Sequence, residues 1–130
     1  MKITKQILEK IIKHAKLQAP IEACGYLAGW EKVASHHYEL VNTDKSSEHF
    51  SFEPQEQFSV LRDARAKDLK ILAVYHSHPQ SQARPSPEDI RLAYDPDLYY
   101  VIVSLAQKQP KVAVFTIRQG EVRKEEIEVI

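Results

Sequence analysis

The apolar run from Ile71 to Tyr75 constrains the fold of this chain more than any other segment. A short run of this kind is typical of an interior strand that is covered on both faces. Residues 79–87 follow closely, and because they contain three prolines and no large apolar side chain, they must form a loop. We therefore expect the other segments to build a sheet around residues 71–75, with a loop leaving the end of that strand.

The spacing of apolar residues predicts helices and strands on both sides of this run. Helices are expected between a Thr4 cap and Pro20, over 54–69, and over 86–94. Strands are expected over 24–30, 33–41, 49–52, 71–75, 99–105, 111–117 and 121–129, the last two as a hairpin turning at Gln119-Gly120. The order of these elements predicts an α/β fold with a single mixed, mostly antiparallel central sheet flanked by helices.

Length, charge and cysteine content narrow the classes of function. The 130 residues fit one domain spanning 1–130. Lysine plus arginine and aspartate plus glutamate both number 18, so no basic field favours nucleic acid or a membrane surface as a partner. The only cysteine, Cys24, allows no intrachain disulfide, which suits a reducing compartment. With neither a signal-peptide pattern nor a spanning segment, a cytoplasmic protein is expected; its oligomeric state stays open.

Two histidines at the end of the 71–75 strand are candidate metal ligands. Side chains two residues apart in a strand leave the same face, so His76 and His78 can converge on one point. Asp89 can return to that point if the proline-rich loop folds back. Imidazole and carboxylate ligands both suit Zn²⁺, and three protein ligands with an open position are typical of catalytic zinc sites. Glu22 is a candidate proton acceptor, although position alone does not distinguish it from other acidic residues.

The full motif is more specific than its parts. The chain reads His76-Ser77-His78-Pro79, then six residues, then Ser86-x-x-Asp89, with a distant Glu22. It thereby resembles the JAMM (also called MPN+) metalloprotease family, whose signature is a distant Glu followed by HxHPx(6)SxxD. The resemblance extends over nearly the whole chain, through the EACGYLAG, FEPQEQF and VIVSL segments, and is greatest to the compact bacterial members. It implies an MPN domain, with the layering shared by cytidine deaminases.

The resemblance also implies roles and substrates. His76, His78 and Asp89 would bind Zn²⁺, Glu22 would activate the water and protonate the leaving amine, and Ser86 would help to stabilise the oxyanion. Compact bacterial members act on ubiquitin-like sulfur carriers, after the C-terminal Gly-Gly, either trimming the tail or releasing cysteine. With 130 residues, the chain is too short for the added loops with which eukaryotic members grip polyubiquitin, so linkage-specific deubiquitination is not implied.

Other interpretations stay open at this stage. Ser86 and Asp89 also fit a helix-capping box with Pro87 at the first helical position. The enzyme could be a broader isopeptidase for lysine-linked small modifiers, or the domain could be a non-catalytic MPN scaffold, although such scaffolds usually lack the metal residues. Cys24 is expected to be a small buried strand residue, although a thiol so close to Glu22 could coordinate the metal. His14, His36, His37 and His49 show no ligand pattern and are expected to be ordinary helix, strand or loop residues. Trp30, Tyr99 and Tyr100 are expected to be core or edge aromatics, one of which could contact a substrate.

Overall fold

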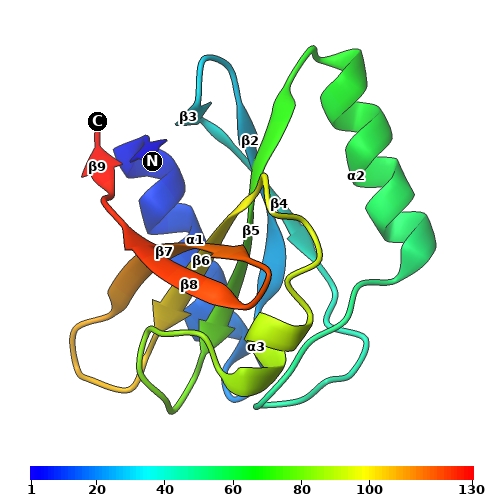
Figure 1. The fold of residues 1–130 in the computed structure, drawn as a ribbon. Coiled ribbons are helices and arrows are strands. Elements are labelled where there is room, and N and C mark those ends of the chain that lie inside the picture. The colour runs from blue at the N-terminus through cyan, green and yellow to red at the C-terminus, as the bar shows by residue number, and fades with distance from the viewer.

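A six-stranded sheet, in the order β4-β2-β5-β6-β7-β8, forms the centre of the computed structural model, which describes residues 1–130 (Figure 1). Every neighbouring pair is antiparallel except β5 and β6. The expected mixed, mostly antiparallel sheet flanked by helices is confirmed. The elements are β1 (Lys2–Ile3), α1 (Lys5–Gln18), β2 (Cys24–Gly29), β3 (Val33–Ala34), β4 (His36–Leu40), α2 (Pro54–Ala66), β5 (Lys70–His78), α3 (Pro87–Arg91), β6 (Tyr99–Ser104), β7 (Lys111–Arg118), β8 (Glu121–Glu125) and β9 (Glu128–Val129).

The two longer helices cover opposite faces of the sheet. Thr4 caps α1 by accepting a hydrogen bond from the Ile7 amide at 3.2 Å. One apolar stripe of α1, which includes Ile11, packs on the face formed by Leu27, Tyr75 and strand β6. On the other face, Val60 and Ala64 of α2 pack against the outer side of β2. Strand β5 is therefore buried between two layers, as its apolar sequence predicts.

Several sequence-based boundaries are wrong, including the third helix, which ends at Arg91 instead of residue 94, and the 71–75 strand, which extends over Lys70–His78. Residues 49–52 form a loop instead of a strand, because hydrogen bonds to Asn42 and Thr43 occupy their backbone groups. The segment 33–41 is divided at Ser35 into β3 and β4, and 121–129 is divided into β8 and β9.

The missed strand β1 pairs in parallel with both β3 and β9, forming a small second sheet. A two-residue strand is too short to produce a periodic pattern. The second helix also ends earlier than expected, at Ala66, where Asp68 turns the chain with a φ of 58°.

The pairing of β2 with β5 brings the start of one strand beside the end of the other. Cys24 lies opposite His76, and the Ala23 amide donates a hydrogen bond to the Ser77 hydroxyl at 2.7 Å. Gly25 allows this close packing, because a Cβ atom there would lie 2.0 Å from the Tyr38 carbonyl oxygen and 2.5 Å from the Tyr75 ring.

We predict that Gly25→Ala lowers the free energy of unfolding by ~1–3 kcal/mol, since both neighbours of the added methyl group belong to the packed sheet. Chemical denaturation would measure the change. Gly120→Asn is the matched control, because Gly120 has open space around it and Asn tolerates its φ of 79°. Equal stability of the two variants would contradict the steric argument.

Candidate metal centre

Three side chains converge at the carboxyl end of β5. The Nε2 atoms of His76 and His78 lie 3.2 Å apart, and the Asp89 Oδ2 atom lies 3.2 Å from the first and 3.1 Å from the second. Both imidazoles are almost fully buried. The three residues form the only group of His, Cys, Asp and Glu side chains in the chain that could hold a metal ion.

The start of α3 holds the carboxylate of this cluster. Ser86 and Asp89 form a reciprocal capping box, so the alternative helix-capping interpretation is confirmed and coexists with the cluster. The Ser86 amide donates to Asp89 Oδ2 at 2.9 Å, and Ser86 Oγ accepts from the Asp89 amide at 3.1 Å. The oxygen that caps the helix is therefore the one that faces the two histidines.

The electrostatics of the cluster favour an ionised carboxylate. Burial opposes ionisation of Asp89, but its hydrogen bonds with His76, His78 and the Ser86 amide outweigh burial and hold the pKa of Asp89 well below its usual range. Burial also disfavours the charged form of His78. Its bonds to Asp89 and to the Gln82 carbonyl, 2.8 Å from Nδ1, outweigh that effect and raise its pKa.

The donor set fits a divalent metal ion. Ligands about 2.0 Å from a tetrahedral Zn²⁺ lie about 3.3 Å from one another, close to the separations observed here. The Gln82 carbonyl orients the His78 ring by bonding its outer nitrogen, which is how histidine ligands are usually supported. The ring of Phe50 stacks on His76 at a centroid distance of 4.8 Å and an interplanar angle of 27°.

Glu22 is a buried carboxylate beside this cluster. Its side chain is 2% exposed, and its Oε1 atom has no hydrogen-bond partner in the protein. Burial raises the pKa of Glu22 to about 8; the charge of His78 opposes the shift, and Asp89, Glu88 and Glu48 add to it. Since buried carboxylate oxygens almost always accept hydrogen bonds, this atom is suited to a donor from outside the chain, such as water.

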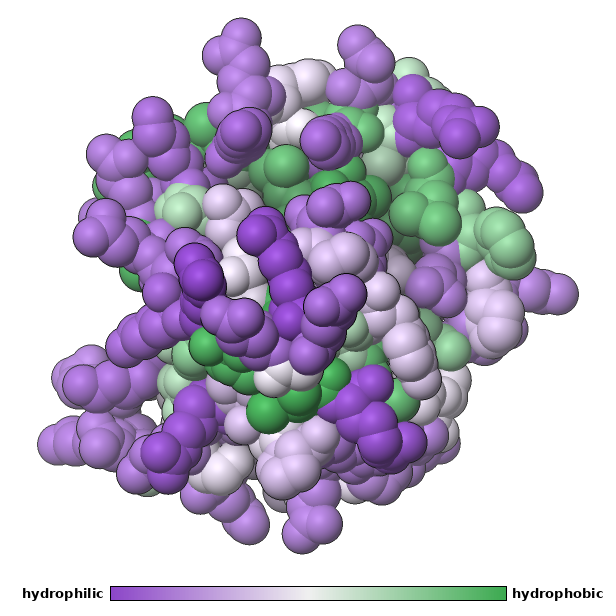
Figure 2. Space-filling model, viewed as in Figure 1, coloured by the Kyte–Doolittle hydropathy of each residue, from purple (hydrophilic) through white to green (hydrophobic).

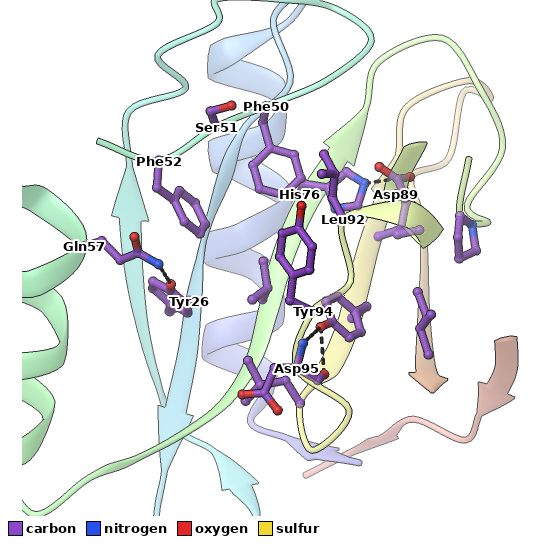
Figure 3. A pocket seen from close by; sticks show the side chains of 16 residues that line it. Tyr26, Phe50, Ser51, Phe52, Gln57, His76, Asp89, Leu92, Tyr94 and Asp95 are labelled. Carbon is purple, nitrogen blue, oxygen red and sulfur yellow. Dashed lines mark hydrogen bonds and ion pairs between the residues drawn. The ribbon is translucent and has the colours of Figure 1, made fainter. Parts of the chain in front are cut away.

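Two cavities of different character meet at the cluster. One cavity, of about 430 Å³, is lined by His76 and Asp89 and by mostly apolar residues, among them Tyr26, Phe50 and Tyr94 (Figure 3). A second cavity of about 500 Å³ has no hydrophobic lining residue and is lined by Glu22, Ser47, Glu48, His78, Gln80, Ser81, Ser86, Pro87 and Glu88.

The outer surface also has separate hydrophilic and hydrophobic regions. Figure 2 shows hydrophilic side chains over most of the viewed face, with hydrophobic surface beside α2 and around α3. The large apolar side chains that are exposed include Phe58 and Leu61 on α2, and Leu92 and Tyr94 after α3. Leu92 and Tyr94 extend the wall of the apolar cavity to the outside.

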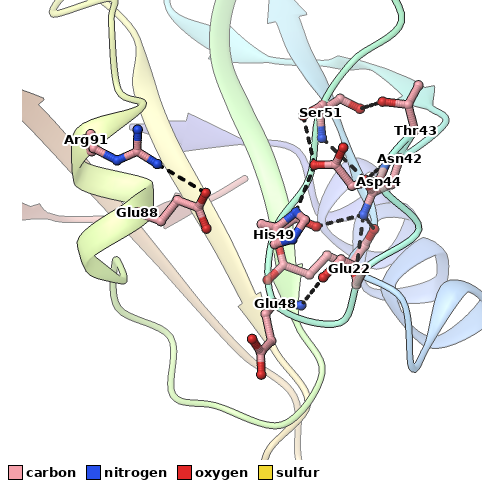
Figure 4. A network of polar contacts seen from close by, with 10 residues as sticks. Glu22, Asn42, Thr43, Asp44, Glu48, His49, Ser51, Glu88 and Arg91 are labelled. Atoms are coloured by element: carbon pink, nitrogen blue, oxygen red, sulfur yellow. Dashed lines mark hydrogen bonds and ion pairs between the residues drawn. The ribbon is translucent and has the colours of Figure 1, made fainter.

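Asn42 is a buried residue whose importance the sequence does not indicate. Its Nδ2 donates to the carbonyls of Glu22, Ser46 and His49, at 3.1, 3.4 and 3.0 Å. Its Oδ1 accepts from the amides of Asp44 and Ser51 (Figure 4). Asn42 thus ties the loop 42–52, which presents Phe50 to His76, to the backbone of Glu22. No local pattern in the sequence could have revealed contacts across this distance.

The other residues considered in the sequence analysis are not ligands of the cluster, although Tyr100 lines the apolar cavity beside it. Cys24 is fully buried in β2, and burial raises its pKa to about 12, so it is held as a thiol. His14 is bonded to the Tyr75 hydroxyl, and His49 to Asp44. Trp30 is exposed at the end of β2, and Tyr99 and Tyr100 are half-buried. No helix is both long and apolar enough to cross a membrane.

Solved structures similar to this chain define its class. A protein of Desulfitobacterium hafniense, DSY2949, is 41% identical, with a TM-score of 0.91 over 99% of this chain and 92% of that one. A structure described as a JAMM metalloprotease-like zinc site is 26% identical, with a TM-score of 0.66 over 100% of this chain and 97% of that one. The fold is that of the JAB/MPN proteins.

The family follows from the sequence comparisons. A model described as prokaryotic homologs of the JAB domain matches residues 4–118. The CysO-cysteine peptidase of Mycobacterium tuberculosis is 31% identical over 131 residues, covering 98% of this chain and 90% of that protein. A probable TtuB-protein conjugate cleaving protease of Thermus thermophilus is 33% identical over 92 residues, 70% of this chain and 62% of that protein. The chain belongs to the prokaryotic JAB-domain family and is a peptidase of the JAMM type, as the motif predicts.

We predict that Asn42→Ala lowers the free energy of unfolding by ~2–3 kcal/mol, because several buried backbone groups lose their partner. Turnover should fall as well, since the Glu22 carbonyl and the Phe50 loop are released. Urea denaturation and a peptidase assay would measure the two effects. Thr43→Ala is the matched control, because it removes one exposed bond to Ser51 in the same loop. A stability equal to that of the control would contradict the role given to Asn42.

Proposed function

We propose that this protein is a single-domain, cytoplasmic zinc (iso)peptidase that hydrolyses the amide bond after the C-terminal Gly-Gly of a ubiquitin-like sulfur carrier. The reaction would trim the carrier tail or release cysteine from it. The observation that carries this proposal is the convergence of three metal-ligand atoms beside a buried carboxylate oxygen that has no partner. Relatives named for cleaving CysO-cysteine and TtuB conjugates support this substrate class.

His76, His78 and Asp89 would hold the metal in this proposal. Their nitrogen and oxygen donors and their mutual spacing suit Zn²⁺. A zinc ion there would supply Lewis acidity, which makes water a nucleophile near neutral pH and polarises a carbonyl. Neighbouring groups would preorganise the ligand side chains for metal binding, because the Gln82 carbonyl orients His78 and the α3 cap orients Asp89.

Glu22 would move the proton. Its free oxygen accepts a proton from the attacking water and then delivers it to the nitrogen of the breaking amide, so the amine leaves neutral and the carboxylate is restored. A pKa raised by burial suits both steps at neutral pH. The Ser86 Oγ atom accepts a hydrogen bond from the Asp89 amide. The hydroxyl hydrogen of Ser86 is therefore free to donate a hydrogen bond to the oxyanion that develops on the substrate carbonyl.

The apolar cavity would take the carrier tail. It reaches the cluster through His76 and Asp89, between the loop 42–52 and the segment after α3 (Figure 3). A Gly-Gly segment has no side chains, so it can lie extended beside the cluster while the preceding part of the tail lies in the cavity. A broader isopeptidase for lysine-linked modifiers is the second candidate, and the name of the Thermus thermophilus relative favours it.

We predict that Glu22→Gln retains zinc but lowers turnover by ~10²–10⁴, because the amide keeps the shape of the side chain and cannot carry the proton. Zinc content by atomic absorption and cleavage of a carrier–tail fusion would be measured on the same sample. Glu53→Gln, which changes an exposed carboxylate at the start of α2, is the control. Retained turnover in Glu22→Gln would remove this residue from the mechanism.

We predict that His76→Ala and Asp89→Asn each lose zinc and activity together. Asp89→Asn is the sharper test, because its amide oxygen can still cap α3 while the anionic ligand is gone. His37→Ala is the control, since that histidine pairs with Glu39 on β4. About one zinc per chain, with chelator-sensitive cleavage after Gly-Gly, is expected of the unaltered protein. Normal zinc content in either ligand variant would overturn the assignment.

A further inference from the structure

The polar cavity beside the metal cluster has a strongly acidic wall. Glu22, Glu48 and Glu88 line it, and neither lysine nor arginine does. In Figure 4, Glu88 on α3 lies on one side, with Glu22 and Glu48 on the other. The Glu48 carboxylate has no hydrogen-bond or ion-pair partner, and Glu88 pairs only with Arg91, at 3.3 Å on the exposed surface. The buried, unpartnered oxygen of Glu22 adds a third acidic group to this wall.

The chemistry decides which part of the substrate enters this cavity. Glu22 has to reach the nitrogen of the breaking amide to protonate it, so the leaving amine lies on the side of Glu22. The carrier tail then occupies the apolar cavity, on the side of His76 and Asp89. Glu48 and Glu88 therefore face the departing group.

We propose that Glu48 and Glu88 select the leaving group by charge. They favour an amine with no carboxylate next to the scissile nitrogen, such as a lysine side chain in a protein conjugate, over a free amino acid such as cysteine. This inference rests on the proposed function and refines it. In the reaction, water oxygen bonds to the carbonyl carbon, the carbon–nitrogen bond breaks, and the amine takes one proton from the water through Glu22.

Repulsion between like charges is the physical basis of this selection. An amino acid attached through its α-amine places its carboxylate two bonds from the scissile nitrogen, inside the acidic cavity. A lysine attached through its side chain keeps its own α-carboxyl group far away, in a neutral peptide bond. Glu48 is exposed and the Glu88 side chain is 41% exposed, so this repulsion acts in the partly solvated mouth of the cavity. Their combined repulsion at several ångströms would reduce cleavage of the anionic adduct by up to roughly tenfold.

The nearby lysine and arginine side chains do not line this cavity, although Arg91 pairs with Glu88 at its exposed edge. Arg84, Lys111 and Lys124 line a separate cavity of about 450 Å³, which shares no lining residue with the acidic one. A leaving group that extends from Glu22 therefore meets the acidic wall first.

Two substrates that differ by one charge test the proposal. A carrier tail ending in Gly-Gly-cysteine carries a free carboxylate, and the same tail ending in Gly-Gly-cysteinamide does not. We expect the zinc-loaded protein to cleave the cysteinamide substrate with roughly tenfold higher kcat/KM than the cysteine substrate. A tail joined to a lysine side chain should be cleaved as fast as the cysteinamide substrate. In the double variant E48Q/E88Q the ratio should fall towards one. Glu9→Gln, an exposed carboxylate on α1, is the control and should keep the ratio.

A ratio near one in the unaltered protein, or a ratio unchanged in E48Q/E88Q, would overturn the proposal and leave the proposed function intact. If no tail is cleaved, the proposed function fails, and a binding measurement still decides the charge claim. Nuclear magnetic resonance titration of the zinc-loaded protein with lysinamide should shift the backbone amides of Glu48 and Glu88, and this shift should be lost in E48Q/E88Q. Equal shifts with lysinamide and N-acetylcysteine would refute it.

Discussion

The carboxylate of Asp89 is the contact on which the candidate site depends. One oxygen atom accepts the Ser86 amide at the start of α3 and faces both histidine nitrogens within 3.2 Å. Forming this cap takes little conformational freedom from the backbone, because the proline ring of Pro87 already fixes φ at the first helical residue. The geometry of the helix start therefore sets the geometry of the ligand cluster, and the orientation of one side chain serves both.

Burial of the sheet on both faces gives this cluster its rigidity. Strand β5 lies between the α1 layer and the α2 layer, and its last residues are held by pairing with β2 and β6. The loop 42–52 completes the support, since Asn42 fixes the Glu22 backbone and Phe50 stacks on His76. Such support matters because a metal site loses affinity when its ligands have to be ordered during binding.

The division between apolar and acidic cavities gives the site a direction. The apolar side suits a chain that binds in an extended form, and the acidic side suits an amine leaving group that carries no carboxylate. The ligand set would fix the reaction, and the polarity of the two walls would then influence which substrate this chain accepts. Substrate choice would then depend on the charged side chains around a metal centre that the family shares.

The sequence by itself determined the local features, namely the α/β class, the exposed proline-rich loop and the spacing of the ligand motif. Alternation along a strand places His76 and His78 on one face, and a capping box fixes Ser86 and Asp89, because both rules act over a few residues. Only the tertiary structure decided what lies beside them. Glu22 reaches the cluster through the pairing of β2 with β5, and residues 49–52 became a loop tied to Asn42, since such contacts join segments that leave no common local pattern.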